Sequence, residues 1–249
     1  MLKLLKKKTK QGNKKNSFVS NIFAIIVALF IALLFRSFFY QAFVIPSGSM
    51  EPNLLIGDYL FVSKYDYGYS RYSFPFGLFG LGGDSRVFYK EPKRGDIVIF
   101  KYPSNPNEDF VKRVIGLPGD KVQVIGGVVY LNDKPLKNKV IGTENRGGIK
   151  YTILEETLPD GKSFKIYKDY SIYNPANNTQ AYYVKKDHFF VMGDNRDYSR
   201  DSRFRDVGQI PKVNLEGKAR VIFFSINGYF LQFWKWNQIR FNRIFNTIS

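Results

Sequence analysis

The tripeptide Ser47-Gly48-Ser49 offers two hydroxyl groups separated by the most flexible residue. Glycine lets the chain bend tightly, which can bring a backbone N–H close to whatever Ser49 attacks. A serine becomes a nucleophile only when a base removes its proton. The chain has no cysteine and one histidine, His188, so that base is either His188 or a lysine. Most Ser-Gly-Ser sequences are turns or linkers, and the tripeptide alone does not decide between these roles.

Lys112 lies in a β-branched run, Val111 to Ile115, in which alternation cannot keep every side chain in water. On the apolar face its ammonium would be desolvated, which lowers the pKa toward the range where a neutral amine accepts a proton. The alternative is an ordinary solvated strand lysine. Arg113 points the other way and is expected to be exposed or ion-paired. His188 follows three charged residues, which is typical of a surface or edge-strand histidine.

A third cluster, Gly193 to Arg203, mixes charges of both signs with two serines directly after an apolar run. This composition favours a rigid loop held by ion pairs and by bonds from side chains to the backbone, although a surface turn has the same composition. Its Asp and Asn residues lack the spacing of a calcium loop. The cysteine and histidine counts exclude cysteine-ligated zinc and iron–sulfur sites. We therefore expect no metal and no cofactor.

These clusters need elements to hold them, and the amino end predicts the first one. The chain carries 38 Lys and Arg against 21 Asp and Glu, and seven of the lysines lie in residues 1–17, which contain no acid. Phe18 to Phe35 then has no charged residue. At about 1.5 Å per residue such a helix is roughly 27 Å long, enough for a bilayer core of about 30 Å if Arg36 reaches the interface. We predict a transmembrane anchor over residues 18–40.

Two other interpretations of the apolar run are weaker. A cleaved signal peptide ends in small residues, whereas aromatic residues dominate positions 38–43. A buried core helix normally shows a polar stripe, and none is visible from Ile22 to Phe35. Because lysine-rich flanks stay in the cytoplasm, we expect a cytoplasmic tail over residues 1–17 and an extracytoplasmic chain from about residue 41.

Beyond the anchor, short β-type runs alternate with Gly, Pro, Asn and Asp, and no long amphipathic helix is visible. The predicted fold class is mostly β with antiparallel sheets, and Gly126-Gly127 is a hairpin signal. The predicted strands are Asp58–Ser63, Ile97–Lys101, Val111–Ile115, Lys121–Ile125, Val128–Leu131, Tyr151–Leu154, Phe164–Tyr167, Tyr182–Val184, His188–Met192 and Ala219–Ser225.

Two further segments, 65–89 and 223–249, each hold nine aromatic residues with cations among them. Such residues suit a membrane interface, and ordinary packing within the domain is the alternative. Nucleic-acid binding uses the same residue types, but the predicted compartment argues against it. We expect a phospholipid bilayer as a partner, and no nucleic acid.

Four blocks in order then resemble the bacterial type I signal peptidases, also called leader peptidases: Pro46 to Pro52, Lys93 to Phe100, Phe110 to Asp120, and Gly193 to Arg203. The resemblance runs from the anchor to about Ser225. Some members carry two anchors where this chain has one. The implied fold is a catalytic β core over 41–115 and 183–225, with an inserted β-rich lobe over 116–182. Residues 226–249 would form an aromatic, basic, membrane-associated end.

The resemblance also implies a role for each site residue. Ser49 would be the nucleophile and Lys112 the general base, and the Ser47 hydroxyl beside the Ser49 amide would form the oxyanion hole. Ser199 would hydrogen-bond the Lys112 amine. The ion pairs supporting the dyad would be formed by Asp194, Arg196, Asp201 and Arg203. The substrate pockets, which admit alanine, would be lined by Phe43, Ile45, Met50, Leu54, Phe110 and Val111.

The implied protein is a serine endopeptidase of the bacterial cytoplasmic membrane, with one membrane pass. It would cleave the signal peptides of exported preproteins after Ala-x-Ala-type sequences. One alternative with the same chemistry is a self-cleaving Ser-Lys regulator of the repressor type, which would be soluble and carry its own cleavage site; neither feature is visible. A non-catalytic, membrane-anchored basic adaptor is the alternative from another class.

Overall fold

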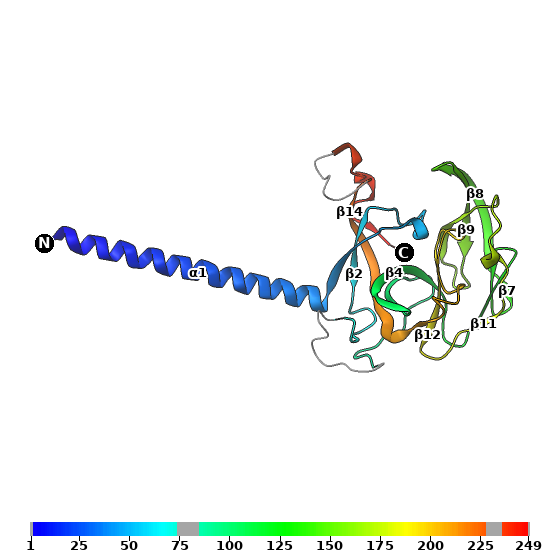
Figure 1. Cartoon of the computed structure of the whole chain (residues 1–249), viewed down its shortest axis with the longest axis horizontal. Coiled ribbons are helices and arrows are strands. Elements are labelled where there is room, and N and C mark those ends of the chain that lie inside the picture. Colours follow the sequence, from blue (N-terminus) through cyan, green and yellow to red (C-terminus); the bar gives the residue numbers. More distant parts are fainter. Residues whose placement is uncertain (1, 74–84, 228–235, 249) are drawn as a thin grey trace.

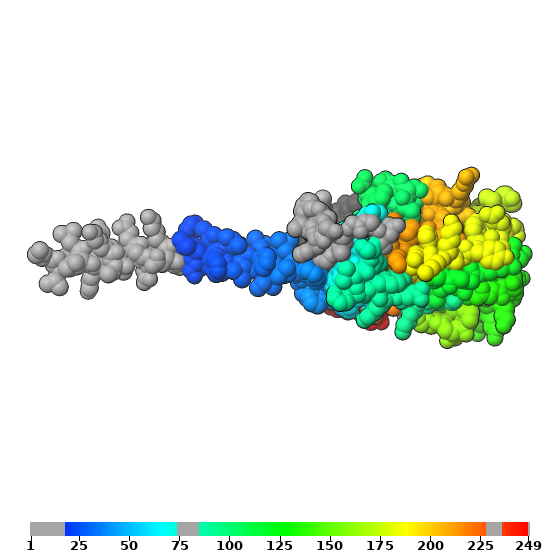
Figure 2. Space-filling model, turned by 90° about the horizontal axis from the view of Figure 1, so that it is seen from below, coloured from blue at the N-terminus to red at the C-terminus, as the bar shows by residue number. Residues whose placement is uncertain are grey.

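The computed structural model describes residues 2–73, 85–227 and 236–248, with residues 2–17 described by their backbone alone. A long helix, α1 (Leu2–Phe38), projects as a rod from a β-rich body (Figure 1 and Figure 2). Within the described chain, Phe18–Phe38 is the one helical stretch long and apolar enough to cross a membrane, and none of it is buried. An apolar helix with no protein packed around it needs an apolar solvent, which agrees with the expected anchor.

The helix ends two residues earlier than the predicted anchor. Phe39 N–H still donates to Phe35 O at 2.8 Å, but Tyr40 already pairs with Ser63 in the first strand. The chain therefore passes from the anchor into the β body almost without a linker.

Eight strands form one antiparallel sheet in the order β1-β2-β14-β3-β4-β12-β13, with β15 beside β14. The central strand β14 pairs with β2 on one side and with β3 on the other. The strands are β1 (Tyr40–Val44), β2 (Asp58–Ser63), β3 (Ile97–Tyr102), β4 (Asn105–Gly116), β12 (His188–Met192), β13 (Ile210–Pro211), β14 (Leu215–Ser225) and β15 (Asn246–Thr247).

The chain between β4 and β12 forms two smaller antiparallel sheets, on the side of the molecule away from α1 (Figure 1). One has the order β10-β9-β8 and the other β11-β5-β6-β7. Their strands are β5 (Lys121–Ile125), β6 (Val128–Leu131), β7 (Lys134–Pro135), β8 (Lys137–Arg146), β9 (Ile149–Thr157), β10 (Ser163–Lys168) and β11 (Tyr182–Tyr183). Gly126 and Gly127 both have positive φ at the β5–β6 turn, as the hairpin signal predicts.

The large sheet is covered on both faces, as the side chains of β3 show. Its side chains alternate, so that Val98 and Phe100 join one buried cluster while Ile97 and Ile99 join the other. A strand segment buried on both faces is an unbroken apolar run in the sequence, as Ile97 to Phe100 is here.

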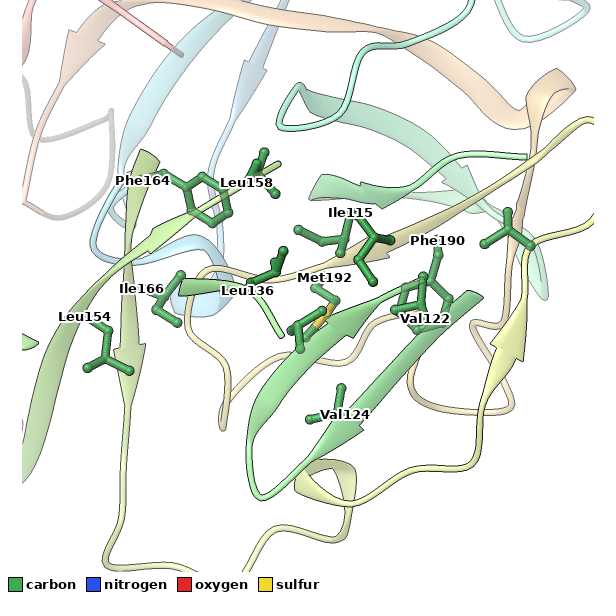
Figure 3. Close-up of a cluster of buried hydrophobic side chains, with 13 residues drawn as sticks. Ile115, Val122, Val124, Leu136, Leu154, Leu158, Phe164, Ile166, Phe190 and Met192 are labelled. Atoms are coloured by element: carbon green, nitrogen blue, oxygen red, sulfur yellow. The ribbon is translucent and has the colours of Figure 1, made fainter. Parts of the chain in front are cut away.

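A third buried cluster joins the large sheet to the two smaller ones. Ile115, Phe190 and Met192 come from the large sheet, Val122 and Val124 from one smaller sheet, and Leu154 and Ile166 from the other (Figure 3). Each such side chain contributes about 1.5–3 kcal/mol when fully buried. The three sheets therefore share this cluster, and its contacts fix β4 and β12 against the two smaller sheets.

The mostly β, antiparallel fold with one apolar amino-terminal helix confirms the predicted fold class. The predicted strand list missed β1 and β8, as well as the two-residue strands β7, β13 and β15, and it began β4 at Val111 instead of Asn105. β8 is largely exposed at a sheet edge and has few apolar residues, so alternation gives little signal there. The start of β4 contains Pro106 and two asparagines, a turn-like composition that pairing with β3 overrides.

The two aromatic segments are only partly visible, since Phe74, Phe76, Phe79 and Trp234 lie outside the described residues. Tyr67 is buried and donates to Asp96 at 2.9 Å, which is ordinary packing. Trp236, Phe241 and Phe245 are between 62% and 76% exposed, as side chains at an interface with lipid would be.

Candidate active site

Ser49 lies on a one-turn 3-10 helix, η1 (Gly48–Met50), that follows β1. Ser47 precedes this turn in extended conformation, with φ −134° and ψ 154°. Two features hold the turn: Met50 is buried in the core cluster below, and Leu54 N–H donates to Met50 O at 2.9 Å. The turn thus has a fixed position after the extended segment, and it places the Ser49 side chain at the wall of a cleft.

Lys112 lies on β4 opposite Val98 of β3, and its side chain is almost fully buried. Its Nζ is 2.7 Å from Ser49 Oγ, which is hydrogen-bonding distance. Of the two side chains left open by the sequence, the structure thus brings Lys112 to Ser49. His188 instead lies at the start of β12, where its Nδ1 is 2.9 Å from Lys186 O.

Burial lowers the pKa of Lys112 to about 8. The nearby carboxylates of Asp201 and Asp194 act in the opposite direction, and Arg203 adds to the lowering. A lysine with this pKa is partly neutral near pH 7, and only the neutral amine can accept a proton.

The Ser47 hydroxyl is 3.4 Å from Ser49 Oγ, so the two serines of the tripeptide face the same space. A substrate carbonyl attacked by Ser49 would develop its negative charge within reach of the Ser47 hydroxyl and the Ser49 N–H. Fixed donors at such a position are each worth about 3–4 kcal/mol to a transition state.

Arg113, the neighbour of Lys112, is buried and paired, as the sequence allowed. Its guanidinium bonds both carboxylate oxygens of Asp194 at 2.8 Å and also donates to Gly95 O at 2.7 Å. Asn53 Nδ2 donates to the same carboxylate at 2.7 Å. The ion pair therefore links the strand carrying Lys112 to the segment that follows the turn of Ser49.

The other predicted ion-pair residues are also buried and paired. Arg203 bonds both oxygens of Asp201 at 2.8 Å, and Asp201 accepts from Gly193 N–H at 2.9 Å. Arg196 pairs with Glu156 of β9, a partner that sequence reasoning did not find. Such networks are costly to interrupt, because removing one member leaves a buried charge unpaired.

Ser199 is close to Ser49 but does not make the bond to Lys112 that was expected of it. Its Oγ is buried and forms no hydrogen bond within the part of the chain that the structure describes, so the expected contact with Lys112 is not formed. The hydroxyl lies against Gly193, where a Cβ would collide with both Ser199 and the carbonyl of Ser49. Lys112 directs its amine to Ser49 instead.

Asn195 is a site residue that sequence reasoning missed. Its backbone N–H donates to Ser49 O at 3.1 Å and its side chain donates to Gly48 O at 3.2 Å. The loop from Gly193 to Arg203 thus bonds directly to the turn that carries Ser49. The sequence signal that could have identified Asn195 is its position within the block from Gly193 to Arg203.

A cleft of about 500 Å³ opens in front of Ser49 and Lys112. Four of the predicted pocket residues line it: Ile45, Met50, Phe110 and Val111. Leu54 is fully buried in the cluster behind, which Phe43 packs against, and neither is among the lining residues. The cleft also borders Tyr198, Arg200, Glu108 and Asp109, which sequence reasoning did not find.

No group of three or more His, Asp or Glu residues within the described ranges is placed to hold a metal ion. The chemistry that this arrangement supports is attack by a serine hydroxyl with an amine as the base.

The family model for signal peptidase, peptidase S26, matches residues 18–224. The chain belongs to that family. Signal peptidase I of Rickettsia akari is 40% identical over 236 residues, which cover 88% of each chain. Signal peptidase I of Rickettsia typhi is 43% identical over 217 residues, covering 85% of this chain and 80% of the relative.

A crystal structure of a signal peptidase I from Enterococcus faecalis is 26% identical, with a TM-score of 0.33, and the match covers 52% of this chain and 97% of that one. The resemblance found in the sequence is confirmed by family membership. The chain is therefore a serine peptidase, a hydrolase of the signal peptidase type. A non-catalytic adaptor does not fit a member of a peptidase family.

Proposed function

We propose that this chain is a membrane-anchored serine endopeptidase that removes N-terminal signal peptides from exported preproteins, with Ser49 as nucleophile and Lys112 as general base. The observation that supports it best is the 2.7 Å contact between Ser49 Oγ and an almost fully buried lysine amine. The relatives are named signal peptidase I, which supports the substrate class.

In the proposed reaction, neutral Lys112 takes the proton of Ser49 as its Oγ bonds the scissile carbonyl carbon. The Ser47 hydroxyl and Ser49 N–H stabilise the resulting oxyanion. Lys112 then passes the proton to the leaving amine as the peptide C–N bond breaks. A water molecule, deprotonated by Lys112, attacks the ester that remains and releases the signal peptide and Ser49.

The four supporting residues of the last motif act through position in this proposal. Asp194 and Arg113 hold β4 against the segment after Ser49, and Asp201 and Arg203 hold the loop that contacts the turn. Arg196 joins this loop to Glu156. Ser199 packs against Gly193 beside the Ser49 carbonyl, and its part in the proposal is to hold this contact.

The walls of the cleft support a preference for small residues before the cut. Phe110 stacks on Tyr102 with ring centroids 4.7 Å apart, so the Phe110 side chain cannot easily move away from the cleft. Ile45 and Val111 also line the cleft, and their branched side chains support the proposed preference for alanine over larger residues. The extended backbone at Ser47 lies past the end of edge strand β1, where a substrate strand can add to the sheet.

The membrane places substrate and site together in this proposal. The seven lysines of residues 1–17 stay in the cytoplasm, α1 crosses the bilayer, and the β body lies outside. Ser49 is only eleven residues beyond the end of α1, so it lies within about 40 Å of the membrane surface. The exposed aromatic residues at 236–245 would rest at that surface.

The proposed domain division follows the pairing of the strands. Residues 41–115 and 183–225 supply the catalytic core, residues 116–182 the inserted lobe, and residues 226–249 a closing segment. We place the protein in the bacterial cytoplasmic membrane.

The test uses the full chain in detergent micelles with a preprotein as substrate. Ser49→Ala and Lys112→Ala are each expected to lower kcat by at least about 10³-fold, because a nucleophile–base pair acts as a unit. Lys150→Ala, which removes an exposed lysine of β9, is the matched control and keeps the wild-type rate. Processing at the wild-type rate by either dyad variant would refute the proposal.

A further inference from the structure

The carboxylate of Glu51 packs against the turn that carries the nucleophile. Glu51 follows η1 directly, and its backbone N–H donates to Gly48 O at 3.1 Å. A Cβ placed on Gly48 would lie 3.2 Å from Glu51 Cδ and 3.3 Å from Oε2. The carboxylate therefore lies beside the backbone that joins Ser47 to Ser49, where the proposed oxyanion hole is formed.

Glu51 is only 6% exposed, and a buried carboxylate needs a counter-charge. Arg146 supplies it, with Nη2 3.2 Å from Glu51 Oε1. Burial raises the pKa of the Glu51 carboxyl, and Arg146 is the strongest influence in the opposite direction. The other charged groups acting on Glu51 are Arg240, which lowers its pKa, and Glu144 and Asp58, which raise it.

Arg146 reaches this position from the inserted lobe, 95 residues further along the chain. It is the last residue of β8, and the turn that follows, Gly147-Gly148, has positive φ at both residues. The hairpin end is itself held, because Tyr167 of β10 donates its hydroxyl to Glu144 and stacks on Tyr151. A fixed hairpin therefore presents Arg146 to the nucleophile turn.

The charge of Glu51 affects the proposed reaction because an oxyanion forms beside it. An unpaired carboxylate next to the Ser47–Ser49 backbone would oppose the negative charge that develops on the substrate oxygen, most strongly where water is excluded. It would also be free to pull the turn toward solvent. Pairing with Arg146 removes both effects.

Resting on the function proposed above, we propose that Arg146 is a positioning residue for proteolysis: it pairs with Glu51, holds the nucleophile turn, and neutralises the carboxylate beside the oxyanion hole. The inserted lobe thereby acts on catalysis through one side chain at a hairpin end. The family motifs of the sequence do not include Arg146.

The test measures kcat and KM for preprotein cleavage by the full chain and its variants from pH 4.5, the ordinary pKa of a glutamate, up to pH 9. Arg146→Ala is expected to lower kcat about tenfold or more with KM within about twofold, since the substrate cleft itself is unchanged. Adding Glu51→Gln is expected to restore kcat to within about threefold of wild type, because the unpaired charge is gone. Arg146→Lys keeps the positive charge but lacks the planar guanidinium, so its kcat should lie between those of Arg146→Ala and the wild type.

The pH dependence separates this role from a merely structural one. The ratio of variant to wild-type rate should fall as pH rises through the raised pKa of Glu51, because the uncompensated charge exists only above it. Lys150→Ala, on the partner strand of the same hairpin, is the control and keeps the wild-type ratio at every pH.

Three results overturn the inference: a kcat for Arg146→Ala within about twofold of wild type, a rate ratio that does not change with pH, or equal losses in the single and double variants. Ser49→Ala, run in parallel, tests the proposed function separately. If Ser49→Ala is inactive while Arg146→Ala is normal, the dyad stands and only the role of Arg146 fails.

Discussion

Replacing Lys112 by methionine should abolish activity and yet stabilise the protein. Burial lowers the pKa of Lys112 from 10.5 to about 8, so the folded state holds this proton more weakly than the unfolded state does. Each tenfold loss of proton affinity costs about 1.4 kcal/mol, which gives a penalty of about 3 kcal/mol below pH 8. Methionine has a similar length and no charge, and it fills irregular apolar space well.

The gain is reduced by the lost bond to Ser49, which is worth about 1 kcal/mol, so the net stabilisation at pH 7 is about 2 kcal/mol. For a domain of this size that raises Tm by roughly 4–8 °C. The sign follows from linkage: the unfolded chain binds the extra proton between pH 8 and 10.5, so wild-type stability rises across this range. The advantage of Lys112→Met should therefore shrink from pH 8 upward and vanish by about pH 10.5.

The assay is thermal unfolding of the full chain in micelles, followed by circular dichroism, at intervals from pH 6 to 10.5. Lys150→Met, which changes an exposed lysine, controls for the loss of one positive charge and should show no such convergence. A Lys112→Met protein that is no more stable than wild type at pH 7 would refute the reasoning. So would an advantage that stays constant up to pH 10.5.

Three further predictions concern the packing beside Ser49, the buried Asp58 and the substrate cleft. Gly193→Ala should lower kcat at least about tenfold, measured by preprotein cleavage, because the new methyl group collides with Ser199 and the Ser49 carbonyl; an unchanged kcat would contradict that packing. Arg243→Ala should lower the free energy of unfolding by about 2–3 kcal/mol, since Arg243 pairs with the fully buried Asp58 at 2.6 Å. Exposed Arg205→Ala should change the same unfolding free energy by less than about 0.5 kcal/mol, and equal effects of the two would contradict the account. Val111→Ala should raise the cleavage rate of a preprotein with valine before the cut by about tenfold relative to the alanine substrate, and an unchanged preference would show that Val111 does not set the pocket size.

The sequence could predict the parts of this molecule that have a strong local pattern. The apolar run from Phe18 to Phe35 has no charge to interrupt it, and β3 begins with four consecutive apolar residues, Ile97 to Phe100, so both could be predicted. The motifs led to Ser49 and Lys112 as candidates, and the structure brings the two side chains into contact. Alternation alone left open whether Lys112 was solvated or buried.

The missed features depend on contacts between distant segments. β8 is a strand because β9 pairs with it, while its own residues are mostly polar and exposed. Glu51 and Arg146 meet only because the two smaller sheets pack on the large sheet through a shared core. The Ser199 hydroxyl differs from expectation because its position depends on packing against Gly193, which spacing along the chain does not reveal.

The central claim is that a buried, neutral Lys112 activates Ser49, and the pH dependence of kcat/KM tests it most directly. Burial lowers the pKa of Lys112 to about 8, so the rate of preprotein cleavage should rise through an apparent pKa near 8 and level off above about pH 9. A rate that still climbs at about pH 10, where a free lysine loses its proton, would contradict the account.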